Sequence, residues 1–136
     1  MIEVALVFNS SGAPIYWHIP SGASGGAIPD SRQLWHVLWD SRGDLGGVAH
    51  THPWNGEAAP SHTDITTFAA LEAGLGKRLL WPIVTMTEVR YFVSNLYTGQ
   101  IVETPSTFDE ERWWKEQVTE MRRLSHAEGE NKCPKL

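Results

Sequence analysis

The stretch HTHPWNGEAAPSHTD, residues 50–64, restricts the local fold more than any other part of the chain. His50 and His52 end an apolar run, and alternate residues of a strand point to the same face. Pro53 ends that strand, because proline cannot donate a hydrogen bond to a neighbouring strand. Ser61 and Asp64 have the spacing of a helix N-terminal cap. The stretch therefore predicts a strand, a short loop and the start of a helix.

The same residues form a candidate metal site. His50 and His52 on one strand face offer two imidazoles to a tetrahedral ion, and imidazole suits zinc. Asp64, in the first helical turn, can point back towards them as a third ligand. Three protein ligands with one open position are typical of a catalytic zinc, which lowers the pKa of its bound water to roughly 7. His62 is a second candidate for the third ligand, although at the first helical position it tends to point away.

A purely structural interpretation of these residues stays open. Ser61 can cap the helix by accepting the amide N–H of Asp64, whose carboxylate then faces the positive end of the helix dipole. Two histidines separated by one residue also occur on strands by chance. The close spacing of both halves, in this order, favours the metal site.

The rest of the chain predicts a mixed β-sheet flanked by helices, in the α/β or α+β class. Apolar runs and turn residues place strands at 2–8, 14–19, 47–51, 79–85, 88–94 and 100–103. Helical spacing of apolar residues places helices at about 31–41, 61–75 and 108–124. The expected inner faces of the helices carry Leu34, Val37 and Leu38; Ile65, Phe68, Ala69 and Leu71; and Trp114, Val118 and Met121. We expect one domain over residues 1–124 and a flexible tail over 125–136.

Composition excludes several classes of partner. The chain has 136 residues, 41% hydrophobic and 20% charged, as in a globular protein. Eleven basic and sixteen acidic side chains leave a net charge of −5, so nucleic acid is not an expected partner. No apolar run approaches the roughly 20 residues that cross a bilayer. With no secretory signal and one cysteine, Cys133, we expect a cytoplasmic protein with no membrane partner.

The motif His50-x-His52-Pro53, a short loop, then Ser61-x-x-Asp64 resembles the signature of the JAB/JAMM (MPN+) zinc metalloproteases, isopeptidases that include deubiquitinases. The flanking segments LGGVAHTHP and PIVTMTEVRYF are also similar to that family, and the similarity covers most of residues 2–95. Seven residues, 54–60, separate Pro53 from Ser61, one more than the family's usual loop. The resemblance implies an MPN/JAB-like fold, a cytidine-deaminase-like mixed sheet flanked by helices. The PCxxC motif of cytidine deaminases themselves is missing.

The resemblance also implies roles for particular residues. One zinc ion per chain, with a bound water, would be held by His50, His52 and Asp64. The family uses a glutamate on the first strand as general base, and Glu3 is the only glutamate before His50. The alternative for Glu3 is a solvated residue near a terminus. The resemblance assigns Ser61 a hydrogen bond to the developing oxyanion.

The implied activity is that of a compact prokaryotic-type JAB peptidase. Such an enzyme would hydrolyse an amide or isopeptide bond at the C-terminus of a ubiquitin-like or sulfur-carrier-like protein, with E1- or E2-like proteins as further partners. Trp54 directly follows the motif's proline and is a candidate for lining the substrate cleft. Two alternatives remain: a phage-tail or RadC-like use of the domain, in which proteolysis is not assured, and a non-catalytic MPN scaffold. Such scaffolds usually lack the metal ligands that this chain has.

Overall fold

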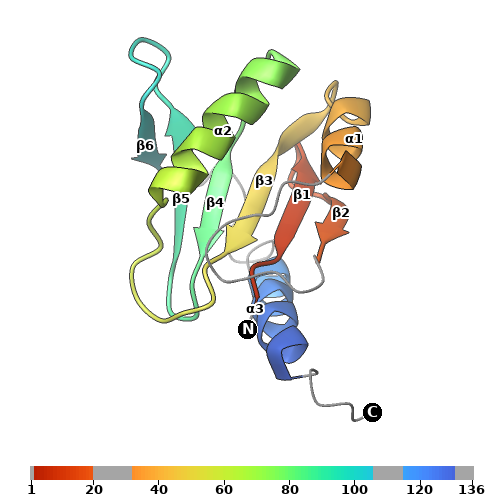
Figure 1. Ribbon diagram of the computed structural model, residues 1–136, viewed down its shortest axis with the longest axis vertical. Helices are drawn as coiled ribbons and strands as arrows, with labels where there is room; N and C mark the ends of the chain where they lie inside the picture. Colours follow the sequence, from red (N-terminus) through yellow and green to blue (C-terminus); the bar gives the residue numbers. More distant parts are fainter. Residues whose placement is uncertain (1, 20–31, 106–114, 131–136) are drawn as a thin grey trace.

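The computed structural model describes residues 2–19, 32–105 and 115–130 (Figure 1). Within these ranges the chain forms a six-stranded mixed sheet and three helices, in the α+β class expected. The strands are β1 (Ala5–Asn9), β2 (Pro14–His18), β3 (Leu45–Thr51), β4 (Trp81–Val84), β5 (Val89–Ser94) and β6 (Ile101–Thr104). The helices are α1 (Arg32–Asp40), α2 (His62–Leu75) and α3 (Lys115–Glu130). No helix in the described parts is both long and apolar enough to cross a membrane.

The strand order in the sheet is β2-β1-β3-β4-β5-β6. β3 and β4 are parallel, whereas all other neighbours in the sheet are antiparallel. Parallel neighbours need a crossover connection, and α2 supplies it here. The C-terminal end of β3 is therefore connected by a single loop to the N-terminus of α2.

The sheet separates two apolar cores, and β1 contributes to both. Ala5 and Val7 pack with α1 and α2, whereas Leu6 and Phe8 pack with α3. This division follows from the alternation of side chains along a strand. Figure 1 shows α1 and α2 over one face of the sheet, and α3 running beside the N-terminal segment. The predicted arrangement of a mixed sheet flanked by helices is confirmed.

Gly47 permits β3 and β4 to lie side by side. A Cβ atom at this position would lie 2.0 Å from the carbonyl oxygen of Leu80 and 2.8 Å from the Phe8 ring. Backbone cannot move out of the way as a flexible side chain can. Only glycine fits here, and the glycine keeps β3 centred between β1 and β4.

The chain ends depart from the sequence prediction. β1 begins at Ala5 rather than at residue 2, and residues 2–4 continue outside the regular strand. α3 continues to Glu130, where the sequence predicts a helix that ends at 124 and a tail from 125. The predicted start of this helix at 108, and Trp114, lie outside the described residues. Ser125 is fully buried and contacts the N-terminal segment, which explains why the helix does not end before it.

The sequence prediction is also wrong for two residues of the inner face of α2. Ile65 and Ala69 are exposed, whereas Phe68 and Leu75 are buried. The buried stripe of α2 begins instead at Asp64. The buried face of α2 therefore begins with a carboxylate, one residue before the apolar side chain with which the predicted inner face begins.

Candidate metal centre

One strand and one helix position the candidate ligands. His50 lies near the C-terminal end of β3, and His52 directly follows the last residue of that strand. Their rings point to the face covered by α2, where the Phe68 ring meets His50 edge-on. Asp64 lies in the first turn of α2, and its side chain is buried. All three residues are at most 1% exposed. The structure therefore brings together the three residues that the sequence motif identifies.

The donor atoms of these residues converge on one point. The Nε2 atoms of His50 and His52 are 3.2 Å apart. Oδ2 of Asp64 lies 3.3 Å from His50 Nε2 and 2.9 Å from His52 Nε2. Ligand bonds of about 2.0–2.2 Å place the donors of a tetrahedral zinc about 3.3–3.5 Å apart, so the separations here lie at or slightly below that edge length. The geometry and the donor types fit one metal ion.

The protonation states of these residues also suit metal binding. Burial opposes ionisation of Asp64. Hydrogen bonds from His50 and His52, the charge of His50 and the Ser61 N–H outweigh burial and hold the pKa of this carboxyl well below its usual range. Burial, as the main cause, lowers the pKa of His50, although Asp64 opposes this shift. A neutral imidazole and an ionised carboxylate are the forms that bind a metal.

The Nδ1 atoms of the two histidines are buried and have no hydrogen-bond partner among the described residues. His50 and His52 have polar contacts only at Nε2, which faces Asp64. All polar contacts of the two rings among the described residues are therefore made by the Nε2 atoms, which face the convergence point.

Ser61 and Asp64 also form the helix cap that the structural interpretation predicts. The Ser61 hydroxyl oxygen accepts the Asp64 N–H at 3.0 Å, and the Ser61 N–H donates to Oδ2 of Asp64 at 2.9 Å. This reciprocal pair is a capping box. The two interpretations are therefore compatible, because the cap fixes the same carboxylate oxygen that faces the histidines.

Glu3 lies on the same face of the sheet as the histidines. Ala5 is paired with His50, and the N–H of Thr51 donates to the Val4 carbonyl at 3.0 Å, so the pairing continues beyond the end of β1. In this antiparallel pairing, Glu3 lies two residues before Ala5 and His52 two residues after His50, so the alternation places Glu3 beside His52. Glu3 is 1% exposed, so it is not the solvated terminal residue of the alternative interpretation.

The Glu3 carboxylate has an unusual environment. Neither of its oxygens has a hydrogen-bond partner among the described residues. Burial, and secondarily the negative charge of Asp64, raises the pKa of Glu3 from 4.5 to about 8. Buried polar groups without partners are rare and point to a functional role or a bound species. A carboxyl whose pKa is raised by burial and a nearby charge is also typical of catalytic sites.

Trp54 lies at the edge of this group. Its ring packs on His52 with centroids 4.6 Å apart, yet the side chain is 44% exposed. The Met86 N–H donates to the Trp54 carbonyl at 3.0 Å, which ties this residue to the turn between β4 and β5. Trp54 therefore presents a fixed aromatic surface to solvent next to a candidate ligand.

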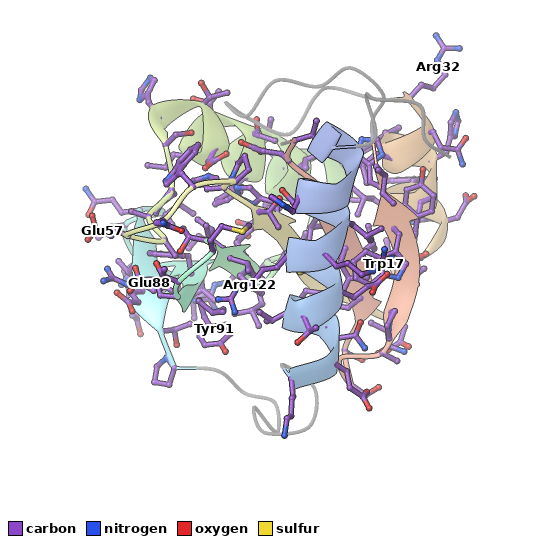
Figure 2. All side chains as sticks on the ribbon, turned by 90° about the horizontal axis from the view of Figure 1, so that it is seen from below. Trp17, Arg32, Glu57, Glu88, Tyr91 and Arg122 are labelled. Atoms are coloured by element: carbon purple, nitrogen blue, oxygen red, sulfur yellow. The ribbon has the colours of Figure 1, made fainter. Side chains whose placement is uncertain are left out.

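The loop that follows Trp54 is held by the same turn. The hydroxyl of Thr85 donates to the Gly56 carbonyl, and Glu88 accepts the Ala58 N–H. Arg122 of α3 donates to the Thr85 carbonyl at 2.8 Å, and Figure 2 shows its side chain extending towards Glu88. The loop of residues 54–60 is thus fixed by hydrogen bonds, and it brings Asp64 Oδ2 to 2.9 Å from His52 Nε2.

The remaining histidines do not join the group. His62 is exposed, and the metal-ligand set of the described residues does not include it. His18 is buried, and burial lowers its pKa. The sequence gives no sign of two further polar residues, Thr51 and Ser125, which are buried between β3, α3 and residues 2–4. Only the completed fold brings them together.

Comparison with known proteins adds no family assignment, since neither the protein-family models nor the curated proteins searched match this chain. The class that the fold and the site define is therefore a single mixed α+β domain with a buried His-His-Asp group that can hold one metal ion.

Proposed function

We propose that the chain is a zinc-dependent peptidase or isopeptidase of the JAMM type, with an MPN/JAB-like fold. The observation that carries this proposal is the position of Glu3. A buried carboxylate with no hydrogen-bond partner lies on the same sheet face as a buried His-His-Asp group, and this pairing suits metal-assisted hydrolysis. A structural metal site would have no use for an isolated carboxylate beside it.

The donor set supports zinc. Two imidazoles and one carboxylate oxygen are typical of zinc sites in hydrolytic enzymes, where a fourth position stays open. When bound, zinc would polarise a water or a carbonyl oxygen, and its charge would lower the pKa of the nearby Glu3 carboxyl.

The chain's own residues supply the proton transfers. Glu3 accepts a proton from the attacking water and returns it to the leaving amine, which otherwise departs poorly. The Ser61 oxygen accepts the Asp64 N–H, and a hydroxyl that accepts can still donate its own hydrogen to an oxyanion. Ser61 is half-buried at the N-terminus of α2, where the helix dipole also favours negative charge.

The proposed substrate is the C-terminal segment of a ubiquitin-like or sulfur-carrier-like protein, with E1- or E2-like proteins as further partners. This choice rests on the resemblance of the motif to JAMM isopeptidases. Trp54 supports it locally, because a fixed and half-exposed indole beside His52 offers a wall for an extended peptide.

The test is cleavage of a panel of ubiquitin-like and sulfur-carrier-like fusions by the zinc-loaded protein, with and without a chelator. We expect cleavage that the chelator abolishes and that added zinc restores. Glu3→Gln should bind zinc yet lose most of the activity, whereas His62→Ala serves as a histidine control that keeps both. Chelator-resistant cleavage, or cleavage by Glu3→Gln at the wild-type rate, would contradict the mechanism.

A further inference from the structure

The orientation of Glu3 is not set by its own side chain. Its two carboxylate oxygens have no hydrogen-bond partner in the described part of the chain. The residue also precedes β1, so the regular ladder of the sheet does not hold it. The direction of the carboxylate must therefore come from the backbone on either side, at Ile2 and Val4.

Thr51 and Ser125 hold that backbone at both positions. Val4 exchanges two hydrogen bonds with Thr51: its carbonyl accepts the Thr51 N–H at 3.0 Å, and its N–H donates to Thr51 Oγ1 at 2.9 Å. Ile2 exchanges two with Ser125: its N–H donates to the Ser125 carbonyl at 3.2 Å, and its carbonyl accepts the Ser125 hydroxyl. Every backbone donor and acceptor of Ile2 and Val4 is thereby engaged.

The two hydroxyls also connect these bonds into one chain. Thr51 Oγ1 donates to Ser125 Oγ at 3.5 Å, so each hydroxyl accepts one hydrogen bond and donates one. Thr51 and Ser125 are both 0% exposed, and water does not compete for these bonds. Connected buried hydrogen bonds of this kind fix a single geometry.

Apolar packing directs the side chains on either side of Glu3. Ile2 and Val4 are each 1% exposed and belong to the core that contains Val118 and Met121 of α3. Because alternate residues of an extended segment point to opposite faces, this packing directs Glu3 to the face of His50 and His52.

We propose that Ser125 is a positioning residue for Glu3, acting together with Thr51 as a clamp on residues 2–4. This inference rests on the proposed function, in which Glu3 transfers the proton. α3 is then more than a cover for the sheet, because its Ser125 keeps the general base facing the metal ligands. The hydrogen bonds of Ser125 go to Ile2 and Thr51 and not to the candidate ligands, so Ser125 acts on Glu3 through the backbone of residues 2–4.

The substitution that tests this role is Ser125→Ala, studied in the zinc-loaded full chain with an authentic N-terminus. It removes the hydroxyl that donates to the Ile2 carbonyl and leaves the helix backbone intact. Thr51 is a poor target, because it lies between two ligands. Thr119→Ala is the matched control, since it removes an exposed hydroxyl of α3 that bonds only to the helix's own backbone.

We expect Ser125→Ala to lower kcat about tenfold or more at constant zinc content, with KM within about twofold, because the interaction lost acts on the chemical step. In a Glu3→Gln background the same substitution should have no further effect on kcat, since the group it positions is already absent. Thr119→Ala should match the wild type in both backgrounds. Amide exchange at Ile2 and Val4 should accelerate about tenfold in Ser125→Ala.

Three results would overturn the inference: wild-type kcat in Ser125→Ala, an equal loss of kcat in both backgrounds, or unchanged amide exchange at Ile2 and Val4. The second result would mean that Ser125 supports the fold in general. A wild-type protein that cleaves no member of the panel would instead refute the proposed function. In that case amide exchange alone decides whether Ser125 holds residues 2–4, and unchanged rates reject the clamp.

Discussion

Replacing Glu3 with glutamine should make the metal-free protein more stable, and by an amount that depends on pH. Burial raises the pKa of Glu3 from 4.5 to about 8, so the native state binds this proton more tightly than the unfolded chain does. The stabilisation from the protonated carboxyl is complete below pH 4.5 and is lost as the pH rises through about 8. Glutamine has nearly the same shape and does not titrate.

The expected magnitude follows from the pKa shift. Each pKa unit corresponds to about 1.4 kcal/mol, so the shift from 4.5 to about 8 corresponds to about 4 to 5 kcal/mol at its full extent. The gain in unfolding free energy of Glu3→Gln over the wild type should therefore be small at pH 4.5, grow by about 1.4 kcal/mol per pH unit, and level off above pH 8. Against a total stability of about 5–15 kcal/mol, this difference is large.

The assay is urea unfolding of both proteins between pH 4.5 and 9 in the presence of a chelator. Glu116→Gln is the control, because it makes the same substitution at an exposed carboxylate of α3. Asp64 also titrates, but its lowered pKa affects stability only below about 3.8 and in both proteins alike. Parallel stability profiles for Glu3→Gln and wild type would refute the burial of an isolated, titrating carboxyl at this position.

Three further predictions concern the ligands, the helix cap and the sheet. Alanine at any one of the three candidate ligands should abolish stoichiometric zinc binding, measured by metal analysis, whereas His62→Ala should retain one zinc per chain. Ser61→Ala should lower unfolding free energy by about 1 kcal/mol through loss of the cap, with zinc retained because the Ser61 backbone N–H still holds Asp64. Gly47→Ala should prevent folding, seen as a loss of soluble protein, because its Cβ would meet the Leu80 carbonyl; Gly43→Ala, with nothing within 4 Å, should be tolerated.

The sequence predicts the sheet well and the helix faces less well. Each described strand corresponds to an apolar run between turn residues, because strands are short and their limits are marked locally. On α2 the periodicity points to Ile65 and Ala69, which are exposed, because the buried stripe contains the carboxylate of Asp64. Hydrophobic patterning cannot identify a buried polar side chain. The partners that make its burial favourable, His50 and His52, come from another element.

The metal ligands are predictable from sequence because they are local. All three lie within one strand–loop–helix unit, in which the same-face rule for His50 and His52 and the capping box of Asp64 follow from short-range geometry. The environment of Glu3 is not local. Its burial depends on contacts between residues 2–4, Thr51 and Ser125, which are separated by up to 123 positions in the chain. Nothing in the sequence near residue 125 indicates that its hydroxyl bonds to Ile2.

The metal ligands depend on local contacts, whereas the position of Glu3 depends on contacts with the distant Ser125. Shortening α3 should therefore disturb the position of Glu3 and leave metal binding intact. A chain ending at residue 124, the domain boundary that the sequence predicts, keeps β3, the loop and α2, and so keeps every candidate ligand. It loses both hydrogen bonds between Ser125 and Ile2. We therefore expect the shortened chain to bind one zinc but to show fast amide exchange at Ile2 and Val4 and a strongly reduced kcat.

The full chain with Ser125→Ala is the comparison, because it loses one of the two bonds and should give an intermediate rate of exchange. Slow exchange in the shortened chain would mean that apolar packing of Ile2 and Val4 holds Glu3 without the help of Ser125.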